Sequence, residues 1–190
     1  MKFGEILFKT RGYLPVPFII VALIWAEPNS ILFFTGVFMV ILGEVIRVWG
    51  VSYAGGATRT RNVGAKKLVT NGPFAFVRNP LYLGNMLMYN GVMILSGSLL
   101  PYSLILMFIF SLVQYHFIVK LEEGKLSEIF GKEYSQYFEN VPRFFPKLVP
   151  YKNKSDFIPD VKGAIKSERS TFYAQFAVLM VFAMRFYFIG

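Results

Sequence analysis

Long apolar stretches alternate with more polar segments along the chain, and this pattern predicts the architecture. A helix needs about 20 mostly apolar residues to cross the hydrocarbon core of a bilayer. Five stretches approach that length, at residues 13–26, 31–53, 81–96, 99–119 and 172–189. The pattern therefore predicts an all-α fold, a polytopic membrane helical bundle of about five transmembrane helices.

Turn-forming residues separate the predicted spans. Pro15 and Pro17 open the first span, and proline is tolerated in the first turn of a helix. Asn79 and Pro80 precede the third span, and residues 96–98 form a Ser-Gly-Ser turn before the fourth. Because so few residues join the third and fourth spans, we expect these two helices to be antiparallel neighbours.

Cationic residues gather in alternate connecting segments. Lys and Arg are frequent before the first span, in residues 54–80 and in residues 120–171, whereas the turns at 27–30 and 97–99 have none. Cytoplasmic loops of membrane proteins carry an excess of Lys and Arg. We therefore expect an integral, multi-pass membrane protein whose N-terminus and two large loops are cytoplasmic, with any site on that face.

The composition excludes several other classes of protein. Hydrophobic residues make up 55% of the 190 residues and charged residues 16%, which is too apolar for a disordered chain or one soluble domain. No cysteine is present to form a disulfide or a thiolate metal site. The net charge of +9 fits basic loops beside an anionic leaflet better than nucleic-acid binding.

We expect a single membrane domain over residues 1–190. It has a motif-bearing core at 60–148 and a C-terminal loop and extra span at 150–190. The expected partner is the lipid bilayer, with no nucleic acid and no metal, and the sequence leaves the oligomeric state open.

The first segment with candidate chemistry covers residues 66–84. Residues 71–73, Asn-Gly-Pro, favour a turn, and Pro80 favours a helix that starts at its own position. Backbone N–H groups, Arg78 and the Asn79 amide then lie at one helix start, which suits an anionic or polar ligand group. The alternative is a re-entrant connection in which Arg78 extends to lipid phosphates.

A second segment, residues 120–137, has apolar residues at helical spacing. It is predicted to be an amphipathic helix that continues from the fourth span. Glu122 and Glu123 lie one turn from the expected bilayer edge. One interpretation is that they bind the ammonium or the ribose hydroxyls of a ligand. The other is that they lie on a solvated face and pair with Lys120 or Lys125, and the residues alone leave both interpretations open.

Three further places carry polar chemistry. Arg143 stands among prolines and aromatic residues in residues 141–146, either as an interfacial anchor or as part of a lid. Glu44 and Arg47 share one face of the second span, and they either pair or form the polar wall of a substrate chamber. His116, the only histidine, lies near the end of the fourth span, where no second ligand set has metal-binding spacing.

These strings together resemble the isoprenylcysteine carboxyl methyltransferase family, whose wider group includes the phospholipid methyltransferases. The resemblance rests on residues 68–74, residues 78–84 and the double-glutamate string 122–134, and it covers about residues 60–148. It implies a helical membrane enzyme that transfers a methyl group from S-adenosylmethionine to a lipophilic acceptor. The cofactor site is then built from the two cytoplasmic segments.

The resemblance also implies roles for individual residues. The residues implied to bind the cofactor are Lys67, Leu68, Val69, Phe74, Asn79, Pro80, Leu81, Tyr82 and Glu122, and Arg78 is added because it lies at the same helix start. The expected catalytic residues are Glu122, Glu123 and Arg47, and the expected substrate contacts are His116, Lys120 and Arg143.

Two positions depart from the family pattern. Asn79 stands where the family usually has histidine, and Ile118 stands where carboxyl-methylating members have an arginine for the acceptor carboxylate. Lys120, His116 and Arg47 are the candidate replacements for that arginine. The acceptor is therefore expected to be isoprenylcysteine carboxylate-like or a lipid.

Two other functions remain alternatives. One is a non-enzymatic or inactive membrane module of the same fold. The other is an NADPH-dependent reductase of sterol type, whose arginine- and aspartate-rich C-terminal signature is not evident in this sequence.

Overall fold

The computed structural model describes residues 3–55 and 67–189, and all regular structure within them is helical. Residues 60–66, at the start of the expected motif-bearing core, lie outside the described residues. The helices are α1 (Phe3–Thr10), α2 (Val16–Ile24), α3 (Ser30–Ala54), the short 3-10 helix η2 (Gly72–Ala75), α4 (Pro80–Ser96), α5 (Tyr102–Phe130), α6 (Lys132–Asn140) and α7 (Val161–Ile189). The all-α prediction is confirmed.

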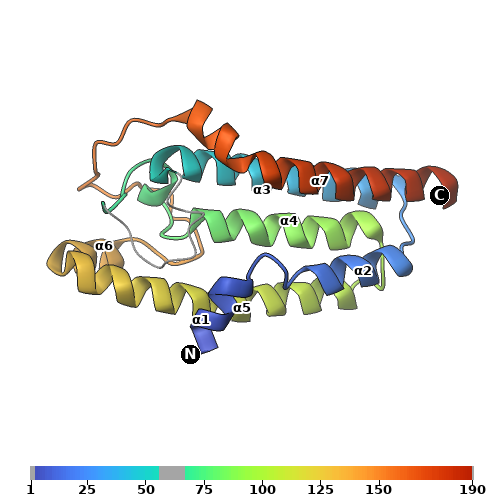
Figure 1. Ribbon diagram of the computed structural model, residues 1–190, viewed down its shortest axis with the longest axis horizontal. Coiled ribbons are helices and arrows are strands. Elements are labelled where there is room, and N and C mark those ends of the chain that lie inside the picture. The colour runs from blue at the N-terminus through green and yellow to red at the C-terminus, as the bar shows by residue number, and fades with distance from the viewer. Residues whose placement is uncertain (1–2, 56–66, 190) are drawn as a thin grey trace.

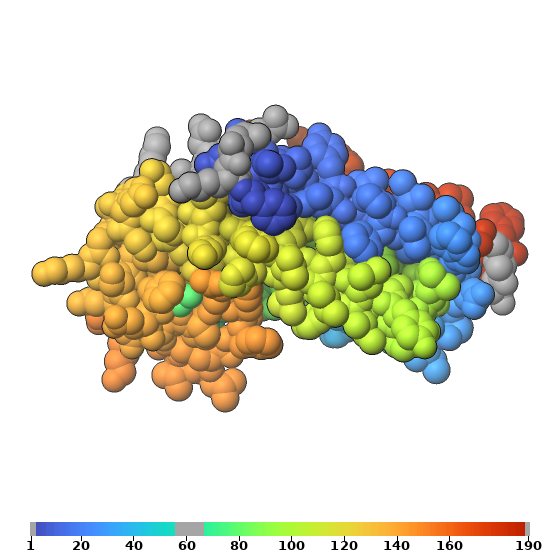
Figure 2. Space-filling model, turned by 90° about the horizontal axis from the view of Figure 1, so that it is seen from below, coloured from blue at the N-terminus to red at the C-terminus, as the bar shows by residue number. Residues whose placement is uncertain are grey.

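The helices form an elongated bundle in which α4 lies between two groups of helices. Figure 1 shows α3 and α7 on one side of α4, and α5 with α1 and α2 on the other. Seen from below, α1 and α2, in blue, lie beside the yellow-green surface of α5 (Figure 2). The core between these layers includes the buried Val40, Leu95 and Met107.

Glycines allow the backbones of α3 and α4 to approach closely. A Cβ atom added to Gly43 would lie 2.6 Å from the carbonyl oxygen of Gly84, and one added to Gly84 would lie 2.6 Å from that of Gly43. Gly36 and Gly91 make the same kind of contact about two helical turns away. Small residues of this kind let membrane helices pack closely, so α3 and α4 form the central pair of the bundle.

Three helices in the described part of the chain are long and apolar enough to cross a membrane, namely α3, α5 and α7. The predicted count of five spans is not confirmed, because α2 has only 9 residues and α4 has 17. The predicted last span began at residue 172, whereas α7 begins at Val161. The start was predicted too late because the first turns of α7 are polar.

The predicted helix boundaries around α4 are confirmed. Asn79 occupies the N-cap position of α4 without a side-chain capping hydrogen bond, and Pro80 is the first residue of the helix. Gly97 follows the helix with a φ of 64°, a backbone conformation that glycine adopts readily, and the chain then turns back into α5. Helix α5 runs beside α4 and continues past the predicted span to Phe130, as the amphipathic pattern predicted. The predicted helix over 120–137 is interrupted at Gly131, which has a φ of 50°, and residues 132–137 belong to α6.

Candidate functional site

The segment that leads into α4 meets the segment that follows α6 at one end of the bundle. The N–H of Arg78 donates to the carbonyl oxygen of Pro142 at 2.9 Å, and the N–H of Tyr151 donates to that of Ala75 at 2.9 Å. Figure 2 shows residues after α6, in orange, packed against the yellow end of α5 and α6. Two segments that are far apart in the sequence therefore form one unit, which we call the junction (residues 68–82 and 122–151).

A buried apolar cluster supports the junction. Its members are Leu68, Ala75, Tyr134, Tyr137, Val141 and Tyr151. Tyr137 also makes a polar contact, because its Oη donates to the carbonyl oxygen of Phe74 at 2.7 Å. Burial raises the pKa of Tyr137 above its ordinary value, so the phenol keeps the proton that it donates.

Arg78 ties the two segments of the junction together. Its Nε and Nη2 donate to Oε1 of Glu123 at 3.1 and 2.9 Å. Its Nη1 donates to the carbonyl oxygens of Phe138, at 2.6 Å, and Val141. The guanidinium also lies 4.1 Å from the centre of the Phe138 ring. Every nitrogen of this guanidinium therefore donates to an acceptor within the protein.

Glu123 is buried between two arginines. In addition to Arg78, Arg143 donates to it through Nε at 3.2 Å and through Nη2, which bonds Oε2. Glu123 is 6% exposed, so it does not lie on a solvated face, and Lys125 pairs instead with Glu128 at 2.8 Å. A carboxylate with two cationic partners is well compensated for its burial.

Glu122 has a different environment from its neighbour. Tyr82 Oη donates to Oε1 of Glu122 at 2.8 Å, and the Tyr82 ring stacks on Tyr115 with 4.6 Å between centroids. A carboxylate has about four acceptor positions. Among the described residues no arginine or lysine forms an ion pair with Glu122, so this carboxylate keeps capacity to accept further hydrogen bonds.

The other predicted site residues of α4, α5 and the following segment lie at or near the junction. Asn79 Nδ2 donates to the carbonyl oxygen of Arg143 at 3.2 Å, which links the helix start to the returning chain. His116 is exposed, and its Nδ1 lies 3.5 Å from Nη1 of Arg143. Lys120 is exposed on α5, and Lys67 lies 5.5 Å from the ring of Phe157.

Arg47 makes its contacts elsewhere, across three helices. Its Nη1 donates to Oδ1 of Asn85 on α4 at 2.6 Å, and its Nη2 donates to Oε2 of Glu168 on α7 at 2.7 Å. Glu44 is farther from it, with Oε2 at 3.7 Å from the Arg47 Nε. The expected Glu44–Arg47 pair is thus one part of a larger cluster that joins α3, α4 and α7.

Comparison with known proteins supports the resemblance found in the sequence. Residues 31–133 match the phospholipid methyltransferase family, from the start of α3 into α6. The chain belongs to this family. The matched region contains residues 68–74 and 78–84 and all but the last residue of the string 122–134, and it ends before α7.

Characterised relatives of this family member are similar over part of their length. It is 32% identical over 139 residues to the cobalt-zinc-cadmium resistance protein CzcN of Cupriavidus metallidurans, covering 73% of this chain and 59% of that protein. It is 30% identical over 118 residues to protein-S-isoprenylcysteine O-methyltransferase B of Arabidopsis thaliana, covering 58% and 57%. The S-isoprenylcysteine O-methyltransferase of Schizosaccharomyces pombe is 37% identical over 86 residues, covering 44% and 34%.

The chain thus spans about three-fifths of the length of the first two relatives, 59% in the case of CzcN. No solved structure matches it. The family membership and the three long apolar helices make it a membrane protein of a methyltransferase family.

The sequence did not identify three residues of this family member that bind the predicted polar residues Arg47 and Glu44. Asn85 and Glu168 bind Arg47, and Gln175 binds Glu44 through a 2.7 Å hydrogen bond from its Nε2. Glu168 and Gln175 lie on α7, outside the region that carries the resemblance. Asn85 and Gln175 are polar residues within predicted spans, and this position could have identified them as candidates. Glu168 lay in a predicted loop, so the sequence contained no such indication for it.

Proposed function

We propose that this chain transfers a methyl group from S-adenosylmethionine to a lipophilic acceptor at the membrane. Membership of the phospholipid methyltransferase family supports methyl transfer. The observation that carries the proposal is the junction, because it brings the Asn79–Pro80 helix start next to the Glu122–Glu123 pair. A single site built from both strings is what the resemblance implies for cofactor binding.

The side chains of the junction fit the chemistry of this cofactor. The cofactor has an ammonium group and ribose hydroxyls, which need carboxylate or amide acceptors, and an adenine ring, which needs an apolar wall. Glu122 is a carboxylate held in place by Tyr82 yet without an arginine partner among the described residues. Leu68 is buried in the apolar cluster, and Phe74, whose carbonyl oxygen accepts a hydrogen bond from Tyr137 of that cluster, is half-buried.

In this proposal the residues of the junction divide into two groups. Those that hold the cofactor are Lys67, Leu68, Val69, Phe74, Asn79, Pro80, Leu81, Tyr82 and Glu122. Arg78 and Glu123 are positioning residues, because their polar atoms already bind protein groups. When bound, the cofactor supplies an activated methyl group, so the main task of the protein is to align donor and acceptor.

We infer that the acceptor approaches from the bilayer side of the junction. Ile118 is fully buried against Tyr115 and Met86, so the position of the family arginine has no cation here. Arg143 lies 3.5 Å from His116 and pairs with Glu123, and Lys120 is exposed on the same helix as His116. In this proposal these three residues supply the positive charge for an acceptor. An isoprenylcysteine carboxylate-like group and a lipid both fit, with the N-terminus and the junction on the cytoplasmic side.

Binding of S-adenosylhomocysteine to the detergent-solubilised protein, measured by calorimetry, tests the proposal. We expect saturable binding that weakens about tenfold or more in Glu122→Gln, because a hydrogen-bonded ion pair with the ligand ammonium is lost. Glu128→Gln is the matched control, since Glu128 is an exposed glutamate on the same helix. The absence of saturable binding by the unaltered protein would overturn the proposal.

A labelled-methyl assay on total membranes then identifies the acceptor. Label recovered in a lipid or in a lipidated protein supports the proposal and names its substrate. Cofactor binding without transfer to any membrane component favours the inactive module instead.

A further inference from the structure

Exposed apolar side chains gather in the segment that follows α6. Phe145 is 79% exposed, Leu148 97% and Val149 68%. We call residues 144–150 the apolar loop. Apolar side chains that are exposed singly are ordinary, whereas several together mark a surface that contacts a membrane or another protein.

The backbone of the apolar loop is held in place by the junction. The N–H of Lys147 donates to the carbonyl oxygen of Phe76 at 3.0 Å, in addition to the two backbone bonds that join the junction on either side of the loop. Arg143, just before the loop, turns inward and binds Glu123. The outward-facing side chains of this segment are therefore apolar ones on an ordered backbone.

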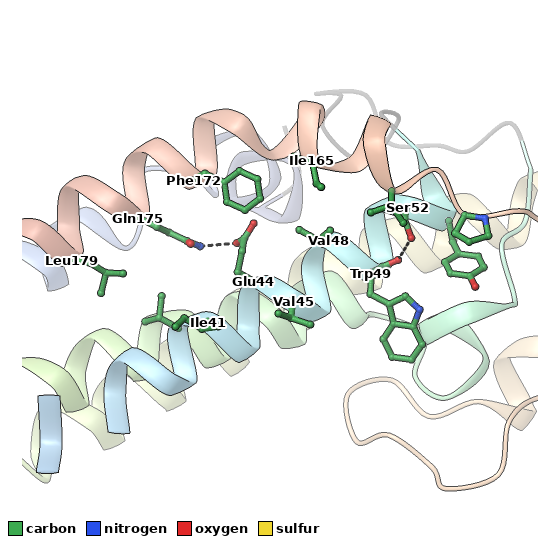
Figure 3. A pocket seen from close by; sticks show the side chains of 14 residues that line it. Ile41, Glu44, Val45, Val48, Trp49, Ser52, Ile165, Phe172, Gln175 and Leu179 are labelled. Atoms are coloured by element: carbon green, nitrogen blue, oxygen red, sulfur yellow. Dashed lines mark hydrogen bonds between the residues drawn. The ribbon is translucent and has the colours of Figure 1, made fainter. Parts of the chain in front are cut away.

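Trp49, near the end of α3, shows the level of the apolar loop along the bundle. The ring of Phe76, whose carbonyl oxygen binds the loop, lies 6.4 Å from the Trp49 ring. Trp49 also lines a mostly apolar groove of about 650 Å³ between α3 and α7, the α3–α7 groove (Figure 3). Both helices are long and apolar enough to cross a membrane, and tryptophan is enriched at membrane–water interfaces. The apolar loop therefore lies at the level where α3 leaves the hydrocarbon.

The apolar loop also projects in the direction of the lipid. Figure 2 shows the orange segment that follows α6 projecting from the side of the elongated bundle rather than from its end. The long helices run along the bundle, so its long axis crosses the membrane. A sideways projection at this level lies among the lipid head groups instead of extending into water.

Cations flank the apolar loop without any acid. Residues 143–154 contain Arg143, Lys147, Lys152 and Lys154 and neither aspartate nor glutamate. Lys152 and Lys154 are exposed, and lysines beside a membrane are attracted to anionic head groups. A second copy docked by the same face in a symmetric dimer would bring these cations together and be repelled. The surface therefore fits anionic lipid better than another copy of this chain.

We propose that the apolar loop inserts Phe145, Leu148 and Val149 into one leaflet of the membrane, where Lys152 and Lys154 bind the head groups of anionic phospholipids. The insertion buries apolar area, and the lysines add attraction to negative charge, a combination typical of segments that lie at a membrane surface. This surface consists of residues that hold no cofactor in the proposed function, so the inference does not rest on that function.

Fluorescence quenching in nanodiscs tests the insertion. The chain has no cysteine, so Leu148→Cys provides a single site for a bimane label. Ile109→Cys, exposed on the apolar part of α5, and Ile129→Cys, exposed near the end of α5, provide the matched sites. We expect the label at position 148 to be quenched by phosphatidylcholine with a nitroxide on its acyl chain, as at position 109. The label at position 129 should be quenched by aqueous iodide instead.

The label at position 148 also measures the preference for anionic lipid. Quenching by nitroxide-labelled phosphatidylglycerol is compared with quenching by nitroxide-labelled phosphatidylcholine. We expect phosphatidylglycerol to bind about fivefold or more tightly, and Lys152→Ala combined with Lys154→Ala to lower this preference by about fivefold or more, because each lysine near an anionic surface strengthens the interaction. Lys125→Ala combined with Lys132→Ala, at two exposed lysines of α5 and α6, should leave the preference unchanged.

Quenching at position 148 by iodide rather than by lipid would overturn the proposal, as would equal binding of the two phospholipids. A label protected from both quenchers would show that protein covers the apolar loop, as in a dimer, and would overturn it too. These measurements use no cofactor. A failure of S-adenosylhomocysteine to bind would therefore count against the proposed function alone.

Discussion

The junction and the α3–α7 groove both bring charged residues into an apolar bundle, but they compensate the charges differently. At the junction Glu123 is held by two arginines, and Arg78 also binds two backbone carbonyl oxygens. Beside the groove Arg47 binds Glu168 and Asn85, and Glu44, which lines the groove, accepts a hydrogen bond from Gln175 and lies 3.7 Å from Arg47. The first arrangement fixes the backbone of loops, and the second connects whole helices.

This difference separates two uses of a buried ion pair. At the junction the arginines neutralise Glu123, whereas Glu122 has no arginine partner among the described residues and is the acceptor for the ligand only in our proposal. At the groove the Arg47 cluster joins α7 to the rest of the bundle, so we infer that residues 1–190 form one membrane domain. Removing a residue from each region should therefore produce different combinations of lost stability and lost binding.

The largest effect is expected for Arg78→Ala, which removes the connection between the two segments of the junction. Breaking a buried pair typically costs about 3–5 kcal/mol, and here two backbone carbonyl oxygens also lose their donor. We expect a large fall in the thermal unfolding midpoint together with loss of S-adenosylhomocysteine binding. Lys125→Ala, which breaks an exposed pair, should change neither quantity measurably. Unchanged binding in Arg78→Ala would show that the junction is not the cofactor site.

A smaller effect, on stability alone, is expected for Glu168→Gln. Glu168 is fully buried and its Oε2 lies 2.7 Å from Nη2 of Arg47. Loss of its charge leaves the buried guanidinium less well compensated, which we expect to cost about 3 kcal/mol in the free energy of unfolding. Affinity for S-adenosylhomocysteine should stay within twofold of the unaltered protein. A tenfold loss of affinity would mean that the two regions are coupled.

The smallest effect, on binding alone, is expected for Tyr82→Phe. This change removes the hydroxyl that holds Glu122 but keeps the ring that stacks on Tyr115. We expect about fivefold weaker S-adenosylhomocysteine binding and a loss of about 1 kcal/mol or less in stability. Tyr173→Phe, at an exposed tyrosine of α7, is the control. If Tyr82→Phe and the unaltered protein bind S-adenosylhomocysteine with equal affinity, the Tyr82 hydroxyl does not contribute to the binding site.

Local rules in the sequence predicted the boundaries of α4 and the course of α5. Asn79 and Pro80 define a helix start by backbone chemistry alone, and the apolar spacing after Lys120 predicted that α5 continues. The start of α7 was missed because residues 161–171 are mostly polar, and a search for apolar stretches cannot detect them. Most of these residues are exposed, and the pairing of Glu168 with Arg47 compensates the one charged residue among them that is buried.

The sequence by itself determined the all-helical membrane class, the family resemblance and the two strings that meet at the junction. These features depend on composition and on near neighbours in the chain. The tertiary structure decided which of two adjacent glutamates is neutralised and which partners Arg47 takes. Adjacent residues on a helix point about 100° apart, so their surroundings come from segments that only folding brings together.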